Sequence, residues 1–204
     1  ILDANAAADG LEVPLVGAVV RHIESNMQAT TDSDGRFTLS GIDAGRQHFD
    51  FLGEPAPHPN GGRYGAYRSA QILYENVDNV IERPIYLMDI ELDSEVIINA
   101  GAGVTVTNQR LGISMNLPAN TVKNDLGEDY VGPISLSEVP AEFTPASLPD
   151  ILQPNLVITV QPMGLTFAQP VPVRFPTPAF LDRNDEVELW SLNHDTGEFF
   201  IAGQ

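Results

Sequence analysis

Two carboxylates and a glycine lie close together between runs of alternating side chains, in the segment Asp32-Ser33-Asp34-Gly35. Calcium loops and β-hairpin corners both use these residue types. A helix-loop-helix calcium loop needs glycine at its sixth position, where counting from Asp32 places Phe37. In a corner, Asp32 accepts backbone N–H bonds and Gly35 adopts the left-handed conformation. We interpret the segment as a structural corner, and keep Asp32 and Asp34 as a candidate metal site for weak calcium binding.

A long connection, "GEPAPHPNGGRYGAYR" from Gly53 to Arg68, concentrates aromatic and basic side chains. Connections of this length in compact domains tend to be functional or mobile. Aromatic and arginine side chains dominate contacts with partner proteins and sugars. The candidate ligand-binding or partner-binding residues are therefore Arg63, Tyr64, Tyr67 and Arg68. In the alternative interpretation, both tyrosines fold back onto the domain and both arginines pair with acidic groups.

The remaining reactive residue types do not assemble into an active-site motif. The four histidines, in no HxH or HExxH pattern, are His22, His48, His58 and His194. His48 and Asp50 share one face of an expected strand, so a surface metal pair is an alternative to a solvated face. Ser191, His194 and Asp195 crowd one hairpin, and no Gly-x-Ser-x-Gly elbow occurs. "GAGVTV" (101–106) lacks the third glycine of a phosphate-binding loop. We expect no enzyme and no cofactor.

Composition indicates a globular and strongly acidic chain. Its 204 residues are 43% hydrophobic, and 28 acidic against 10 basic residues give a net charge of −18. A surface this negative repels nucleic acid and anionic lipid. The absence of cysteine excludes disulfides and thiol chemistry. Such a composition suits a secreted protein, a saline habitat or divalent-cation binding.

Short alternating runs broken by glycine, proline, asparagine and aspartate predict an all-β fold with little or no helix. Two tandem β-sandwich modules are expected, residues 1–90 and 91–204, joined without a flexible linker near Asp89–Asp93. A single short helical turn is expected around Pro145–Leu152. The predicted strands are Gly17–Ile23, Gly35–Leu39, Gln47–Leu52, Ala70–Tyr74, Ile81–Leu87, Glu95–Ile98, Val104–Val106, Ile113–Leu117, Ile134–Val139, Leu156–Pro162, Val171–Phe175, Val187–Leu192 and Glu198–Ile201.

"PLVGAVV" followed by "TTDSDGRFTLSGIDAG" resembles the carboxypeptidase regulatory-like family, which has a transthyretin-like β-sandwich. The resemblance covers residues 1–90. The family implies a non-catalytic module that is often strung along secreted or surface-anchored proteins. The residues that carry it are Pro14, Leu15, Gly17, Ala18, Val20, Thr31, Asp32, Gly35, Phe37, Leu39, Ile42 and Gly45.

"LGISMNLPANTV" and "LVITVQPMGLTFAQPVPVRFP" resemble the ZU5 domain, another β-sandwich. "VELWSLNHDTGEF" closes the pattern as a hairpin, so the resemblance covers residues 95–204. The family implies protein–protein interaction and assembly, and no catalytic residue is carried over. The matching residues are Gly112, Ile113, Leu117, Pro118, Ala119, Pro162, Gly164, Leu165, Phe167, Pro170, Val171 and Val173.

These observations predict a non-catalytic structural or assembly segment of a larger extracellular surface, adhesive or filament-forming protein. The chain begins at Ile1 without Met and stops within a strand-like run, so we expect a piece of a longer protein with strand edges to be covered. Its expected partners are neighbouring domains and other copies of itself, with no nucleic acid and no membrane insertion. The alternative is a glycan-binding or protein-binding module that uses the Gly53–Arg68 loop. A hydrolase in an atypical fold is a third and weaker hypothesis.

Overall fold

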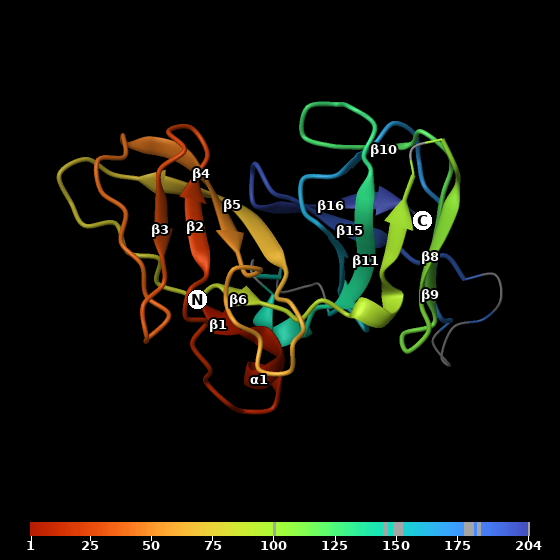
Figure 1. Ribbon diagram of the computed structural model, residues 1–204, viewed down its shortest axis with the longest axis horizontal. Coiled ribbons are helices and arrows are strands. Elements are labelled where there is room, and N and C mark those ends of the chain that lie inside the picture. Colours follow the sequence, from red (N-terminus) through yellow and green to blue (C-terminus); the bar gives the residue numbers. More distant parts are fainter. Residues whose placement is uncertain (100, 145–146, 149–152, 178–181, 183–184, 204) are drawn as a thin grey trace. The chain divides into compact units, whose positions relative to one another are not determined.

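The computed structural model describes residues 1–99, 101–144, 147–148, 153–177, 182 and 185–203 (Figure 1). Strands hold 38% of the chain and helices 6%, so the all-β prediction is confirmed. Contacts divide the chain into two compact units. Unit 1 comprises Ile1–Asp89, Val139–Asn155 and Glu186–Gln204, and unit 2 comprises Ile90–Glu138 and Leu156–Asp185. The expected helical turn at Pro145–Leu152 lies mostly outside the described residues.

Unit 1 is built on a four-stranded antiparallel sheet of order β3-β2-β4-β5 (Figure 1). A parallel pair, β1-β6, and a hairpin, β15-β16, complete its strands. The hairpin was predicted within the 91–204 module, whereas its contacts group it with unit 1. The elements of unit 1 are β1 (Leu2–Asp3), α1 (Ala4–Ala8), β2 (Val19–His22), β3 (Gln28–Thr30), β4 (Gly45–Leu52), β5 (Ala66–Leu73), β6 (Tyr86–Leu87), η2 (Ala141–Phe143), β15 (Leu189–Asn193) and β16 (Glu198–Gly203).

Three antiparallel sheets make up unit 2: β12-β11-β7, β14-β9-β8 and β10-β13. Its buried core is aliphatic apart from one methionine, Met115. The elements are η1 (Leu92–Ser94), β7 (Val96–Ile98), β8 (Val104–Asn108), β9 (Ile113–Leu117), β10 (Val122–Lys123), β11 (Gly132–Glu138), β12 (Ile158–Gln161), β13 (Thr166–Phe167) and β14 (Val173–Arg174).

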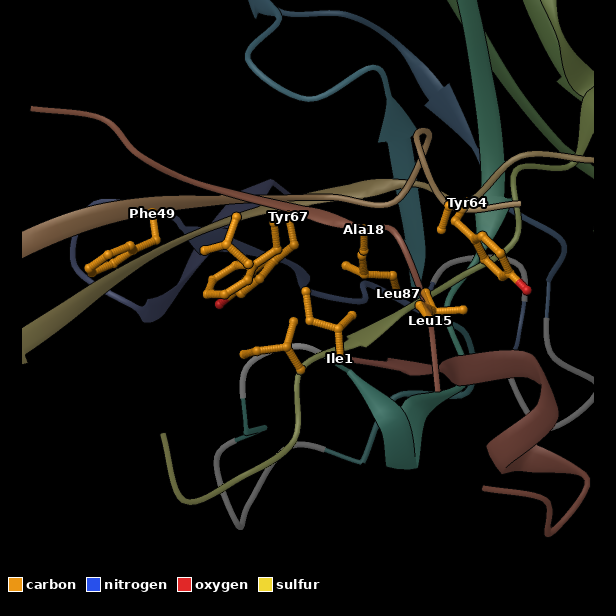
Figure 2. Close-up of a cluster of buried hydrophobic side chains, with 11 residues drawn as sticks. Ile1, Leu15, Ala18, Phe49, Tyr64, Tyr67 and Leu87 are labelled. Atoms are coloured by element: carbon orange, nitrogen blue, oxygen red, sulfur yellow. The ribbon is translucent and has the colours of Figure 1, made fainter. Parts of the chain in front are cut away.

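The core of unit 1 lies on one face of its large sheet (Figure 2). Val20, Phe51 and Tyr67 are cross-strand neighbours on β2, β4 and β5, and all three are buried. The rings of Phe51 and Tyr67 stack with centroids 6.2 Å apart. Since side chains alternate across a strand, the residues between these positions turn to the opposite face. That opposite face carries Arg21, Asp50 and Arg68.

One expected strand is absent from the structure, and one helix was not expected. Gly35–Leu39 forms no strand, although Phe37 and Leu39 pack against the core while Arg36 and Thr38 are exposed. Alternation therefore predicted the burial correctly, but no neighbouring strand supplies ladder bonds. Helix α1 was not predicted. Asp3 caps it, accepting the N–H groups of Asn5 and Ala6 at 2.9 Å, which satisfies donors that a helix N-terminus leaves open.

Candidate functional site

The connection after β4 is shorter than predicted, because β5 begins at Ala66 and takes Tyr67 and Arg68 into the sheet. Its two ends are tied together, since the Gly53 N–H donates to the Gly65 carbonyl at 3.0 Å. Gly65 in turn donates to Met88 at 2.8 Å. A side chain at Gly53 would collide with Tyr64 and Gly65, so this close approach requires glycine. The base of the loop is thus anchored to Met88, the residue that follows β6.

Tyr64 is one of the predicted binding residues, and only 2% of it is exposed. Its hydroxyl donates to Asp3 Oδ2 at 3.0 Å, while Asp3 Oδ1 caps α1. Burial, with the Asp3 carboxylate beside it, raises the pKa of Tyr64 well above its usual range. Tyr64 therefore connects the loop to the first helix, and its hydroxyl is not turned to solvent.

His58 lies beside this pair, with its ring centroid 4.7 Å from that of Tyr64. Its Nδ1 accepts the Gly62 N–H at 3.1 Å, so the proton resides on Nε2, which lies 3.2 Å from Asp89 Oδ1. The two side chains are in contact, but Asp89 Oδ1 accepts no well-formed hydrogen bond among the described residues. Burial raises the pKa of Asp89 despite the opposing effect of His58.

Tyr67 and Arg68 leave β5 on opposite faces. Tyr67 is 5% exposed and lies in the core, where His194 of the β15-β16 hairpin meets its ring at 5.5 Å. Arg68 donates to Asp50, with Nε 2.7 Å from Oδ1. Arg21 approaches Asp50 from β2, with its NH2 nitrogen 2.5 Å from Oδ2. Asp50 is fully buried, and the two guanidinium groups compensate its charge.

The four predicted binding residues therefore do not converge on one surface. Tyr64 and Tyr67 are in the core and Arg68 is bound to Asp50, as the alternative interpretation held. Arg63 is half-buried, with a nitrogen 4.0 Å from Glu54. The sequence also suggested His48 and Asp50 as a surface metal pair. In the structure, His48 Nδ1 lies 2.6 Å from Glu24 Oε1, and Asp50 pairs with the two arginines instead. Each of these side chains contacts other residues of unit 1.

The Asp32 corner has the geometry of an Asx turn. Asp32 Oδ1 accepts the N–H groups of Asp34 and Arg36, both at 2.9 Å, and Gly35 has φ +70°. These N–H groups of Arg36 and Asp34 lower the pKa of Asp32. Asp34 is exposed. Within the described ranges, no group of three or more His, Asp or Glu side chains is placed to hold a metal ion.

Strand β5 lies at the edge of its sheet. The backbone N–H and C=O groups of its successive residues point alternately toward β4 and away from the sheet. His48 accepts from Ile23, so the backbone groups of His48 face β2. In an antiparallel pair, the β5 residue opposite a β4 residue whose backbone groups face β2 points its own N–H and C=O away from β4. Since His48 pairs with Ala70, the outward residues of β5 are Ala66, Arg68, Ala70 and Ile72. The Arg68 carbonyl accordingly accepts from His194 Nδ1 at 2.9 Å.

Unit 2 has a polar cluster that holds η1 against β11. Ser94 Oγ lies 2.8 Å from the carbonyl oxygens of both Glu91 and Leu136, which share its one hydrogen. The side-chain amide of Asn108 donates to the Glu91 carboxylate and to the Leu136 carbonyl. Arg110 closes the cluster at the surface, donating to Glu91 at 2.6 Å and to Glu138 at 2.7 Å. Sequence reasoning missed this cluster, whose members are spread over more than forty positions.

Comparison with protein-family models, with curated proteins and with solved structures finds no match for this chain. The resemblances to the carboxypeptidase regulatory-like family and to ZU5 thus stay predictions. In the part of the chain that the structure describes, no helix is long and apolar enough to cross a membrane.

Proposed function

We propose that this chain is a non-catalytic structural segment of a larger extracellular surface, adhesive or filament-forming protein. One observation carries the proposal. The aromatic, arginine and histidine side chains that could have served in binding or catalysis instead contact other residues of unit 1. The pairs are Tyr64 with Asp3, Arg68 with Asp50 and His58 with Asp89. Side chains used in this way stabilise a module.

A structural or assembling module needs elements held in fixed positions more than it needs a reactive site. The Asp50 group ties β2, β4 and β5 across the sheet, and Tyr64 ties the long loop to α1. What unit 1 offers to other molecules is then its strand edges and exposed apolar side chains, including Ile72 at 57% and Tyr74 at 68% exposure. Strand edges accept further strands through backbone bonds, without needing a catalytic constellation.

The expected partners are neighbouring domains of the same chain and other copies of it. A net charge of −18 keeps copies dispersed, and divalent cations at extracellular concentrations can bridge acidic surfaces. The alternative function, glycan or protein binding through the loop, would need Tyr64 and Tyr67 at the surface. Their burial gives that alternative no support, so we do not adopt it.

The proposal is tested on intact source cells. A protease that does not enter cells should release peptides of this chain, and cross-linking of the native material should join it to flanking domains or other copies. Release only after lysis would contradict the extracellular location. Cross-links confined within single copies would contradict the assembly role. A glycan array probed with the purified chain checks the alternative, with Tyr64→Ala as the matched variant.

A further inference from the structure

The outer edge of β5 is closed at two points by side chains of the same unit. At its far end, the side-chain amide of Asn79 bonds both backbone groups of Tyr74: Oδ1 accepts the N–H at 2.9 Å, and Nδ2 donates to the carbonyl at 3.0 Å. A neighbouring strand would make this same pair of bonds. Asn79 therefore substitutes for a strand at this position.

The tip of the β15-β16 hairpin closes the near end. His194 donates to the outward carbonyl of Arg68, and its ring meets the edge of Tyr67. The Asp195 carbonyl accepts from Arg46, which pairs with Ile72 across the ladder. Leu192 packs against the core and anchors the hairpin. Each contact is small, and both His194 and Asp195 are exposed.

Between these two points lie Ala70 and Ile72, whose outward N–H groups have no partner among the described residues. Sheet edges are commonly protected by proline, lysine or inward-pointing charge. Residues 66–74, "AYRSAQILY", contain no proline and no lysine, and their one charged residue, Arg68, is bound to Asp50. Intramolecular contacts, rather than the strand's own composition, thus protect this edge.

We propose that the outer edge of β5 accepts β5 of a second copy in antiparallel pairing, and that Asn79 and the hairpin tip hold this edge closed. The inference rests on the proposed assembly function and names its contact. Displacing these two guards, Asn79 and the hairpin tip, exposes the outward backbone groups of Ala70, Ile72 and Tyr74 together. The partner's strand then replaces the bonds of Asn79 and His194 with a continuous ladder.

A second copy fits because β5 is self-complementary. With Gln71 opposite Gln71 of the partner copy, Ala70 faces Ile72 and Ser69 faces Leu73, so small residues meet larger ones. No acidic residue occurs from Pro55 to Tyr74, so two copies meet here without the repulsion expected elsewhere at a net charge of −18. The contact is isologous and closes at two copies, so a filament would need a further contact.

A single cysteine tests this pairing, because the chain contains no other. Gln71→Cys would face itself in a non-hydrogen-bonded pair, with Cα atoms about 4.5 Å apart, which suits a disulfide. Oxidised glutathione is the oxidant: two protein thiols form one disulfide and glutathione is reduced to two thiols. The matched control is Gln28→Cys, the same substitution on β3 at the opposite edge.

We expect Gln71→Cys to form a covalent dimer at least about tenfold faster with Asn79→Ala and His194→Ala than with the guards intact, since three hydrogen bonds then no longer oppose opening. Gln28→Cys should not respond to the guards. Ala70→Pro removes an outward N–H that the β4 ladder does not use, so it should abolish the gain. Equal rates with and without guards, or an undiminished gain with Ala70→Pro, would overturn the proposal.

Trp190 fluorescence and hydrogen exchange at β4 check that each variant folds, and Asn79→Ala alone serves if the double variant does not. Asn79 is exposed and its side chain bonds only backbone carbonyls and one N–H, so its loss should be tolerated. This readout uses the purified chain. If native cross-links between copies exist but the guards have no effect, the assembly function survives and only this contact fails.

Discussion

The two units contain the same five-residue corner in different surroundings. In unit 1, Asp32 accepts the N–H groups of Asp34 and Arg36, and Gly35 donates back to Asp32. In unit 2, Asn124 accepts the N–H groups of Leu126 and Glu128, at 3.0 and 2.9 Å, and Gly127 donates back to Asn124. Both glycines have positive φ, +70° and +76°. The neutral amide of Asn124 accepts the same two backbone hydrogen bonds as the Asp32 carboxylate, so this corner forms without a metal.

The surroundings separate the two corners. A Cβ at Gly35 would collide with the Ile1 carbonyl and lie 3.2 Å from Pro14, whereas nothing lies within 4 Å of a Cβ at Gly127. The ion pairs of the two units differ in burial as well. Asp50 of unit 1 is fully buried between two arginines, while Arg110 of unit 2 is 59% exposed between two glutamates. Gly35 and Asp50 of unit 1 are thus buried, whereas Gly127 and Arg110 of unit 2 are exposed.

The largest expected effect is at Asp50. Asp50→Ala leaves Arg21 and Arg68 without their buried partner, and should lower the free energy of unfolding by about 3–5 kcal/mol. Trp190, the chain's one tryptophan, lies in unit 1 and reports the loss in a urea titration. The control in unit 2, Arg110→Ala, should cost about 1 kcal/mol or less, since Arg110 is exposed. Losses of equal size would remove the contrast between the units.

The corners come next. Gly127→Val should cost about 1–3 kcal/mol, because a β-branched residue is strained at positive φ. Gly35→Val adds the collision with Ile1 and Pro14, which costs about another 1–3 kcal/mol. Thermal unfolding of the two variants gives the difference directly. If both melt at the same temperature, the packing around Gly35 contributes nothing.

Acid should change the contributions of Asp89 in unit 1 and Glu91 in unit 2 in opposite directions. Asp89 has a raised pKa, so its contribution is fully present below the ordinary value of 3.8 and is lost as pH rises through the folded-state pKa. Burial alone would raise the pKa of Glu91, but bonds from Arg110, the Glu138 N–H and Asn108 outweigh burial and lower it. Its contribution is present above 4.5 and is lost as pH falls through the folded-state pKa.

Melting curves at pH 6 and pH 3 measure these signs. Asp89→Asn should raise the melting temperature at pH 6, and this gain should shrink at pH 3, where the parent carboxyl is itself protonated. Glu91→Gln should lower the melting temperature at pH 6, and by less at pH 3. A gain from Asp89→Asn that grows on acidification would show that the His58 contact dominates at Asp89.

The smallest expected effect concerns calcium. Asp32 already binds two N–H groups, so any calcium affinity of the acidic surface should be no tighter than about millimolar. Asp32→Asn reproduces the chemistry of the Asn124 corner and should leave the melting temperature nearly unchanged. Calorimetric titration of both proteins checks this, and a micromolar site lost in Asp32→Asn would overturn the structural interpretation of the corner.

Local features of the fold were predictable and non-local ones were not. The Asp32 corner and the alternating burial of Phe37 and Leu39 follow from side chains within a few positions of one another. The α1 cap had a visible signal too, an aspartate ahead of an alanine-rich run. The corner at Asn124 repeats the spacing of Asp32 and Gly35, so a search for Asp or Asn three residues before glycine would have found it.

The candidate site shows the limit of sequence reasoning most clearly. The Gly53–Arg68 segment is rich in tyrosine and arginine, but an aromatic ring buried in a core and one exposed on a loop have the same sequence signature. Tyr64 is buried because Asp3 lies sixty-one positions away in sequence and 3.0 Å away in space. No local pattern contains that information.

By itself, the sequence determined the all-β class, the positions of the corners and the acidity of the surface, because these depend on backbone conformations and charges that each residue carries with it. Tertiary structure alone decided that Asp50 is enclosed by Arg21 and Arg68, that the β15-β16 hairpin belongs to unit 1, and that Asn79 and His194 lie on the edge of β5. Each of these outcomes requires segments far apart in the chain to meet, and strand pairing and burial choose those meetings cooperatively over the whole unit.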